Sequence, residues 1–320
     1  MNLQSYRYVV IGDLVIDVIK DKFGNTVKIS GGGSKFNVLS RMAKYGKDTM
    51  VLAGCGNDEK GTIAIKSLEY YGIDISQVIR KGNKTRQYEL TRKKDGTYSS
   101  KKINWNEEYI ITIEIALNRI KPNDVIILDK LDSIDIKVIQ QIQNDKVIDI
   151  GRIAIVEKFS NQELINLLSG KFELIQLHSK VRRYLLARFG LEDESELMEI
   201  FKPNLLIVTR GNKGADFILS NGKVIRKELI NPTIEVDNTG AGDAFFSKVI
   251  LNYYEEIKGK KEIDEQFIDK LFDEATQITR RVVSFIGAKG DLQVEKRRIL
   301  ARKNLHDSHE VSKIEIGIGE

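Results

Sequence analysis

The stretch VDNTGAGDAFFSKVI, residues 236–250, joins a glycine-rich turn directly to an apolar helical pattern. A plain turn needs one glycine and a plain helix start needs one capping oxygen, but this stretch has two glycines and a carboxylate at the junction. Gly240, Ala241 and Gly242 let consecutive backbone N–H groups converge without side-chain clash, and such a nest binds anions. The dipole of the following helix favours an anion at the same place. The stretch therefore predicts an anion site with an acid, Asp243, beside it.

The helix after this turn has an apolar stripe that predicts packing on the core. Its members are Phe246, Val249, Ile250, Tyr253 and Ile257. Asp243 falls in the first turn, where we expect it to stay ionised and to act as a weak base toward a hydroxyl. A weak base is sufficient for phosphoryl transfer through a loose transition state, in which positioning and charge neutralisation dominate. The competing interpretation is a glycine turn followed by an acidic helix start with no catalytic role.

Composition excludes several classes of protein. The 320 residues are 41% hydrophobic, which is enough for a large core, and the one cysteine, Cys55, rules out intrachain disulfides and multi-cysteine zinc sites. Net charge is +5 from 51 basic and 46 acidic residues, without the concentrated basic patch of a nucleic-acid binder. No apolar run reaches membrane length, and the first residues lack the apolar core of a signal peptide. We expect a cytoplasmic protein with neither a nucleic-acid nor a membrane partner.

Short β-rich apolar runs alternate with helical patterns, which predicts an α/β fold with a mostly parallel sheet. The predicted strands are 8–12, 125–129, 146–150, 173–177 and 204–209, and the predicted helices are 35–46, 60–71, 108–119, 161–168 and 265–286. Two segments, about 14–30 and 84–105, break the rhythm and are hairpin-like, the second with a turn at Asp95-Gly96. They predict either one small projecting sheet or a pair of separate surface hairpins.

With these elements in place, DNTGAGDAF resembles the signature of the ribokinase (PfkB) family of carbohydrate kinases. Five further segments resemble that family's motifs in the same order: VVIGDLVID, SGGGSKFNV, GCGNDEKG, VTRGNKGADF and SFIGAKG. The resemblance runs from about residue 7 to 290. It implies a ribokinase-like three-layer α/β fold with a mostly parallel central sheet and a small β-sheet lid, formed by segments 14–30 and 84–105. The implied domain spans residues 1–304, residues 305–320 form a C-terminal tail, and the lid implies a possible homodimer.

The resemblance also implies a role for each matching residue. Asp243 is implied as the catalytic base, with the backbone from Thr239 to Gly242 as the anion hole. The implied acceptor contacts are Asp17, Gly32, Gly33 and Asn37. The implied nucleotide contacts are Thr209 and Gly211 at the phosphates, Gly214 as a loop-shaping residue and Thr276 near the adenine, where the family usually has Asn.

Several residues near these motifs have two interpretations each. Asp13 lies at the carboxyl end of a strand, where open α/β sheets place ligands, and is either a second acceptor contact or a turn or cap residue. Arg152 is either an acceptor or phosphate contact or part of a surface ion pair. Lys35 either meets an anionic group of the substrate or is solvated. Trp105 and Tyr98 either stack on an acceptor ring or pack on their neighbours.

One departure from the family leaves the metal ligands unknown. Where the family has Asn-x-x-Glu, this chain reads LHSKV, with His178 and Val181 in place of the Asn and Glu. His178 is either a metal ligand or structural. The implied cofactors are still ATP and Mg²⁺, since magnesium bridges ATP phosphates with few protein ligands, and a monovalent cation is a further option.

The sequence thus predicts an ATP-dependent phosphotransferase that phosphorylates a hydroxyl of a sugar or sugar-like molecule. A nucleoside kinase of the same fold is one alternative. A non-catalytic binder of a nucleotide or metabolite is another, favoured by the missing Asn-x-x-Glu and opposed by the intact Gly-Ala-Gly-Asp. A larger acceptor, such as a peptide or a carrier-bound sugar, is a third.

Overall fold

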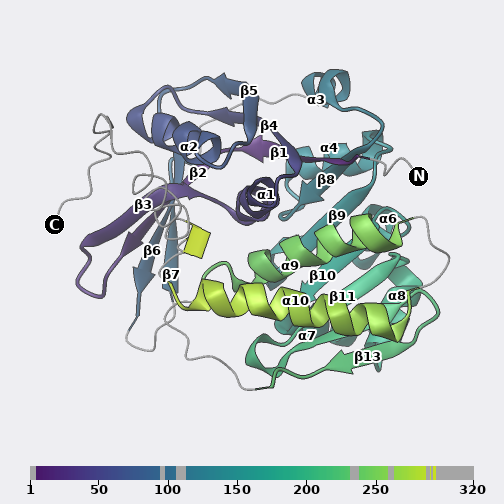
Figure 1. The fold of residues 1–320 in the computed structure, drawn as a ribbon. Helices are drawn as coiled ribbons and strands as arrows, with labels where there is room; N and C mark the ends of the chain where they lie inside the picture. The colour runs from purple at the N-terminus through teal and green to yellow at the C-terminus, as the bar shows by residue number, and fades with distance from the viewer. Residues whose placement is uncertain are drawn as a thin grey trace, which may run out of the picture.

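The computed structural model describes residues 5–93, 98–105, 113–230, 238–258, 263–285, 289 and 291–292. In this part of the chain nine strands form one sheet in the order β13-β12-β11-β10-β9-β8-β1-β4-β5 (Figure 1). They are β1 (Arg7–Asp13), β4 (Asp48–Cys55), β5 (Asp74–Arg80), β8 (Asp124–Leu128), β9 (Lys146–Ile150), β10 (Leu174–His178), β11 (Leu205–Thr209), β12 (Ala215–Leu219) and β13 (Val224–Lys227). Pairing is parallel from β11 to β5, and β12 and β13 add an antiparallel edge. The predicted mostly parallel sheet is confirmed.

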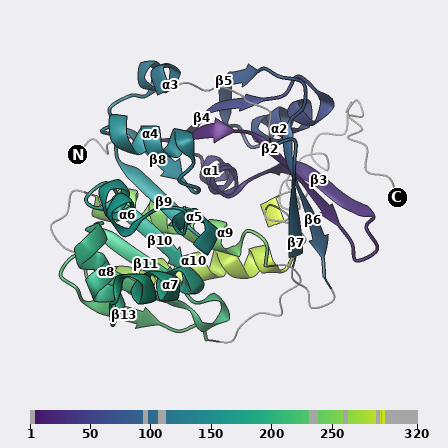
Figure 2. The ribbon, with the colours of Figure 1, turned by 180° about the vertical axis from the view of Figure 1, so that it is seen from behind.

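Helices cover both faces of this sheet, as the two opposite views show (Figures 1 and 2). One face carries α1 (Ser34–Lys44), α2 (Glu59–Glu69), α9 (Ala241–Asn252) and α10 (Glu265–Val283). The other carries α3 (Ile113–Arg119), α4 (Ser133–Gln141), α5 (Ile153–Val156), α6 (Asn161–Leu168), α7 (Ser179–Phe189) and α8 (Glu194–Phe201). Because side chains alternate along a strand, Tyr8 and Val10 of β1 enter one core while Val9 and Ile11 enter the other. The result is the expected three-layer fold.

A second sheet, which we call the lid sheet, projects from one side of the molecule (Figures 1 and 2). Its order is β3-β2-β6-β7, with β2 (Val15–Lys20), β3 (Thr26–Gly32), β6 (Arg86–Arg92) and β7 (Tyr98–Ile103). Parallel pairing of β2 with β6 joins the two segments predicted as hairpins. They therefore form one sheet, and the alternative of two separate surface hairpins is wrong. The predicted turn at Asp95-Gly96 lies outside the described residues, as do the predicted tail 305–320 and the start of the helix predicted over 108–119.

Some elements differ from their predicted bounds. The last helix ends at Val283 rather than 286, with Ser284 as its C-cap. Strands β4, β5, β12 and β13 were not predicted from the sequence. Edge strand β5 reads DISQVIR with no fully buried residue, and β4 ends in small residues, so neither has a run of buried β-branched side chains. Among the described residues, no helix is long and apolar enough to cross a membrane.

A buried ion pair joins α1 to the segment that follows β8. The Lys35 side chain is 2% exposed, with Nζ at 3.0 Å from an Asp135 oxygen and 3.6 Å from an Asp129 oxygen. Gly12 makes room for it, because a Cβ there would lie 3.0 Å from the same Nζ. The prediction of a solvated lysine is wrong. The alternative, contact with an anionic group of the substrate, is disfavoured because the ammonium is already paired with two carboxylates.

We expect Lys35→Met to lower the free energy of unfolding by about 3–5 kcal/mol, because it leaves two buried carboxylates without their cation. Urea unfolding followed by circular dichroism measures the change. The matched control is Lys223→Met, whose partner Glu265 lies 3.1 Å away with both side chains 54% exposed. The control should change stability by less than about 0.5 kcal/mol. Equal losses in the two variants would contradict a structural role for the buried pair.

Candidate active site

Carboxylates gather at the carboxyl edge of the parallel strands. Asp13 ends β1, Asp129 follows β8, and Asp149 is the second-last residue of β9. Neighbouring parallel strands end at the same edge, which is where open α/β sheets bind ligands. Asp243 at the start of α9 belongs to the same group. Besides burial, its charge raises the pKa of Asp149, and the charge of Asp129 raises the pKa of both Asp149 and Asp243.

Asp243 is held between the amino ends of two helices. It lies in the first turn of α9, and its two oxygens accept hydrogen bonds from Ser34 Oγ at 2.5 Å and from Asn37 Nδ2 at 2.7 Å, both in the first turn of α1. Burial raises the pKa of Asp243, while the two hydrogen bonds oppose that rise. The carboxylate is therefore a stronger base than a helix start alone predicts, which corrects that expectation. Asn37, predicted as an acceptor contact, lies directly on the predicted base.

The two glycines of the predicted nest have different structural roles. Gly240 has φ 80°, a left-handed conformation that side chains rarely adopt, and it is the N-cap of α9. The Ala241 N–H closes the turn on the Asn238 carbonyl at 3.2 Å. A Cβ at Gly242 would meet only Gln176 Nε2 at 4.0 Å, so the space in front of this exposed residue is open. Gly240 is thus required by the backbone, whereas Gly242 keeps a space clear at the helix start.

The predicted acceptor contacts Asp17, Gly32 and Gly33 lie together at the join between the lid sheet and α1. A Cβ at Gly32 would lie 1.9 Å from Asp17 Oδ2, so glycine is needed for the carboxylate to approach the backbone. The Gly33 N–H donates to Asp17, and Gly33 has φ 98°. Burial raises the pKa of Asp17 to about 6, an effect opposed by the charge of Lys289.

Lys289 is a site residue that sequence reasoning missed. Its Nζ donates to the Gly31 carbonyl at 2.6 Å, the residue is 3% exposed, and burial lowers its pKa to about 8. The segment SFIGAKG was interpreted through its Gly-Ala turn, but Gly287 and Ala288 lie outside the described residues. A buried lysine beside an acid at the end of the chain has no local sequence signal.

The simpler interpretation fails for Asp13, namely a turn or cap residue, and for Arg152, namely a surface ion pair. Asp13 forms an ion pair with Arg86 of the lid sheet, so it is not a turn or cap residue. Arg152 is exposed at the N-cap of α5, and no ion pair joins it to the rest of the described chain, so a surface ion pair is not seen there. Trp105 packs against Tyr88, with ring centroids 5.1 Å apart, as the neighbour-packing alternative predicts.

The segment GCGNDEKG, residues 54–61, connects the lid sheet to the main sheet through hydrogen bonds. Asp58 is the N-cap of α2, where it accepts from the Gly61 N–H at 2.8 Å, and it also accepts from the Thr85 N–H at 2.9 Å just before β6. A Cβ at Gly56 would lie 2.5 Å from the Thr85 nitrogen. Gly56 therefore lets the chain just before β6 lie directly against the loop after β4.

The predicted nucleotide residues lie around the end of β11 and on α10. Thr209 ends β11 and its hydroxyl donates to the Leu177 carbonyl at 3.4 Å, and Gly211 follows with φ 61°. A Cβ at Gly214 would lie 2.0 Å from the Lys227 carbonyl oxygen, so this glycine allows β12 and β13 to cross closely, in keeping with its predicted loop-shaping role. The Thr276 hydroxyl donates back to the Phe272 carbonyl of its own helix. Thr239 is half-buried beside the nest.

The departure at LHSKV has a structural explanation. His178 Nδ1 accepts from the Lys180 N–H at 3.2 Å and caps α7, and burial lowers the pKa of the imidazole, which keeps it neutral. Val181 is 0% exposed in the core beneath α7. Across the described residues, no group of three or more His, Cys, Asp or Glu side chains is arranged to hold a metal. His178 serves as a cap, and the chain offers no ready-made metal cage there.

Gln176 and Asp149 lie behind the nest and were also missed. Gln176 Nε2 donates to the Gly242 carbonyl at 3.4 Å and is hydrogen-bonded with Asp149. Burial and the nearby charge of Asp243 raise the pKa of Asp149 to about 7. Both residues lie inside short strands that were predicted from their apolar residues, Asp149 in KVIDI and Gln176 in LIQLH.

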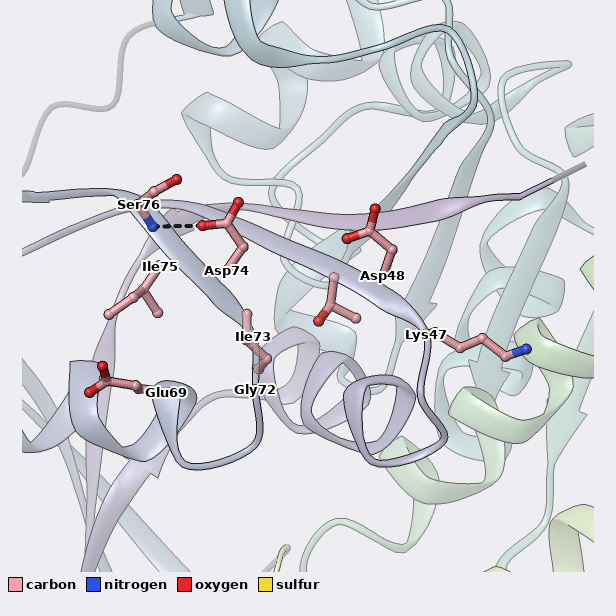
Figure 3. A pocket seen from close by; sticks show the side chains of 9 residues that line it. Lys47, Asp48, Glu69, Gly72, Ile73, Asp74, Ile75 and Ser76 are labelled. Carbon is pink, nitrogen blue, oxygen red and sulfur yellow. Dashed lines mark hydrogen bonds between the residues drawn. The ribbon is translucent and has the colours of Figure 1, made fainter.

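A surface hollow at the start of β4 and β5 is a second candidate for a ligand site, but it lacks the features found around Asp243. It is lined by residues that include Lys47, Asp48, Glu69, Gly72 and Asp74 (Figure 3). Asp48 and Asp74 begin β4 and β5, so the hollow lies at the amino edge of the sheet, opposite to Asp243. Its carboxylates have no nest or buried base beside them.

Comparisons with known proteins bear on the fold and on the resemblance seen in the sequence. Residues 6–145 match the family model described as pfkB family carbohydrate kinase. An ATP-dependent 6-phosphofructokinase of Thermoanaerobacterium thermosaccharolyticum is 24% identical over 271 residues, which are 76% of this chain and 80% of that protein. A nucleoside kinase structure from Methanocaldococcus jannaschii has a TM-score of 0.71 at 18% identity, covering 90% of this chain and 95% of that one. A fructokinase structure from Vibrio cholerae, with fructose, ADP and potassium bound, has a TM-score of 0.70 at 18% identity over 91% and 96% of the two chains. The resemblance and the ribokinase-like fold inferred from the sequence are confirmed.

We expect Asp149→Asn to raise thermal stability most at high pH. The folded-state pKa of Asp149, about 7, lies above its ordinary value near 4, so its favourable contribution is complete below pH 4 and is lost as the pH rises through 7. Asparagine keeps a hydrogen-bonding side chain beside Gln176 and never has to become charged. The Tm difference between variant and parent should therefore grow from pH 4 to pH 7 and stay constant above. A difference independent of pH would show that Asp149 is not buried as a neutral acid.

Proposed function

We infer that this chain is an ATP-dependent kinase related to the pfkB family of carbohydrate kinases, and that it phosphorylates a hydroxyl of a sugar or sugar-like small molecule. The observation that carries the proposal is the buried Asp243 carboxylate, held by Ser34 and Asn37 at the start of α9 and next to the open space before Gly242. A base and an anion site within one helical turn are what transfer of a phosphoryl group to a hydroxyl requires.

In this mechanism Asp243 accepts the proton of the acceptor hydroxyl while the hydroxyl oxygen forms a bond to the γ-phosphorus of ATP. The bond from that phosphorus to the β–γ bridging oxygen breaks, and ADP leaves. The N–H groups at the start of α9 and the helix dipole stabilise the charge on the transferred group. Hydrogen bonds from Ser34 and Asn37 orient the carboxylate. The raised pKa of Asp243 brings its basicity closer to working pH.

The remaining predicted residues support binding of the two substrates. We assign Asp17, Gly32, Gly33 and Asn37 to the acceptor side, where the lid sheet meets α1, with Asp13 and Arg152 at its border. We assign Thr239, Thr209, Gly211, Gly214 and Thr276 to the nucleotide side. Mg²⁺ would neutralise phosphate charge when ATP is bound, and no group of three or more His, Cys, Asp or Glu side chains among the described residues is arranged to hold it. A monovalent cation is proposed only from the potassium present in the fructokinase relative.

Two further proposals follow from the lid sheet and from the fold. The β2–β3 hairpin exposes Phe23, Val27 and Ile29, with exposed fractions of 77%, 57% and 45%, and this apolar strip supports a homodimer formed through the lid sheet. We also retain a nucleoside as the alternative acceptor, since a nucleoside kinase shares this fold.

The alternative of a non-catalytic binder has one observation in its favour and one against it. Val181 is buried where the family's magnesium-placing motif has a glutamate, which favours a binder. A binder would have no need of a buried base at Asp243, which favours the kinase.

We expect Asp243→Asn to keep the fold and ATP binding and to lose about 10²–10⁴-fold in kcat, the usual contribution of a general base. A coupled assay of ADP formation across sugars, sugar acids, sugar phosphates and nucleosides measures turnover. Near-parental turnover would remove Asp243 from the base role. In Ser34→Ala, which removes a hydrogen bond favouring the charged form, the acid limb of the kcat/KM profile should shift to higher pH.

We expect Gly242→Ala and Gly240→Ala to separate function from folding. Alanine at 242 meets no atom closer than 4.0 Å and has the better helix propensity, so Tm should stay or rise while kcat falls, because its methyl group enters the phosphoryl space. Alanine at 240 must adopt φ 80°, so the free energy of unfolding should fall by about 1 kcal/mol and Tm should fall with it. Normal kinetics for Gly242→Ala would contradict phosphate binding at the nest.

A further inference from the structure

One face of the lid sheet presents a row of polar side chains toward the candidate site. Register places Ser30, Asp17, Tyr88 and Lys102 opposite one another across β3, β2, β6 and β7. Directly opposite residues point to the same face of a sheet. Asp17 reaches the Gly33 N–H and interacts with Asp243, so this is the face toward the base. Tyr88 and Lys102 therefore face the acceptor side as well.

Cations from separate elements surround this row. The Trp105 ring has Lys102 Nζ at 4.6 Å, the Arg86 guanidinium at 5.2 Å and Lys130 Nζ at 5.7 Å from its centroid. Lys130 belongs to the main domain, directly after Asp129 at the end of β8. The indole thus brings a lid lysine and a main-domain lysine to one place.

Arg152 completes the group from a third direction. The charges of Lys130 and Arg152 both act on the Tyr88 hydroxyl, where they oppose the rise in its pKa that burial causes. Arg152 is exposed at the start of α5, directly after β9. We call Tyr88, Lys102, Lys130 and Arg152 the basic cluster.

Several acids near the basic cluster already have a cation beside them. The pairings are Asp13 with Arg86, Asp129 and Asp135 with Lys35, and Asp17 with the charge of Lys289. Within the described part of the chain, Lys102, Lys130 and Arg152 form no ion pair, although the charges of Asp13, Asp17 and Asp132 act on Lys130 from beyond ion-pair distance. Three cations and a phenol at the acceptor side are complementary to an anionic group on the acceptor.

We propose that the basic cluster is a subsite for a phosphate monoester on the acceptor, so that the favoured acceptor is a sugar phosphate rather than a neutral sugar or nucleoside. The proposal rests on the proposed function for its assignment of the acceptor side. Three cations and a hydroxyl match the two charges and three terminal oxygens of a phosphate monoester better than they match one carboxylate. Lys102 and Tyr88 would contact this group from the lid sheet, while Lys130 and Arg152 would hold it from the main domain.

The first test is equilibrium binding without ATP, measured by titration calorimetry with fructose 6-phosphate, fructose, gluconate and adenosine. We expect the sugar phosphate to bind at least about tenfold more tightly than the other three. Lys130→Gln and Arg152→Gln should each weaken its binding about 10- to 100-fold, the worth of a charge-assisted hydrogen bond. The matched control is Lys101→Gln, which removes the same charge one residue from Lys102 but on the opposite face of the lid sheet, opposite Glu89. It should leave binding within about twofold.

Equal binding of fructose and its phosphate, tighter binding of gluconate, or equal losses in Lys130→Gln and Lys101→Gln would each overturn the proposal. Turnover of the same compounds with ATP separates this inference from the proposed function. Selective binding of the sugar phosphate without turnover of any acceptor would retain the subsite and reject the kinase. Turnover of neutral sugars with no preference for the phosphate would retain the kinase and reject the subsite.

Discussion

The site depends on one buried carboxylate that two helices share. Asp243 of α9 accepts hydrogen bonds from Ser34 and Asn37 of α1, and an acid buried this deeply would be costly without such donors. The contact holds only if both helices begin at the same edge of the sheet. Left-handed glycines at Gly33 and Gly240 set those two starting points. The position of the base, the opening of the nest and the join to the lid sheet all follow from this meeting of helix ends.

The carboxyl edge of the sheet would be strongly acidic if its members stood alone. Instead the acids are neutralised by partners from different parts of the chain: Arg86 from the lid sheet, Lys35 from α1 and Lys289 from near the end. These pairs also hold elements together, because each cation comes from an element other than that of its acid. Asp243, where proton transfer is proposed, is held by hydrogen bonds from Ser34 and Asn37 rather than by an ion pair. The cations of the basic cluster, where a substrate anion is proposed, form no ion pair with any of the described residues.

The predicted site agrees with the structure where a residue type and a backbone requirement coincide. Gly32 and Gly240 could be predicted because an approaching carboxylate and a left-handed turn both exclude a side chain. Lys35 was misjudged, because its neighbours in sequence give no hint of two carboxylates about a hundred residues away. Lys289 and Asp149 were missed for the same reason: their chemistry comes from burial beside acids that folding brings near.

By itself, the sequence determined the alternation of strands and helices, the glycine turn before α9 and the acid within it, since these depend on local periodicity and on backbone angles only glycine adopts. It also indicated the two lid segments, as hairpin-like breaks in that alternation. Only the tertiary structure decided which charges meet. The partners of Asp13 and Asp129 and the convergence of Lys102, Lys130 and Arg152 depend on how the lid sheet meets the carboxyl edge of the parallel strands. Electrostatic interactions act through space over a few ångströms, so residues far apart in sequence acquire their roles only once the chain has folded.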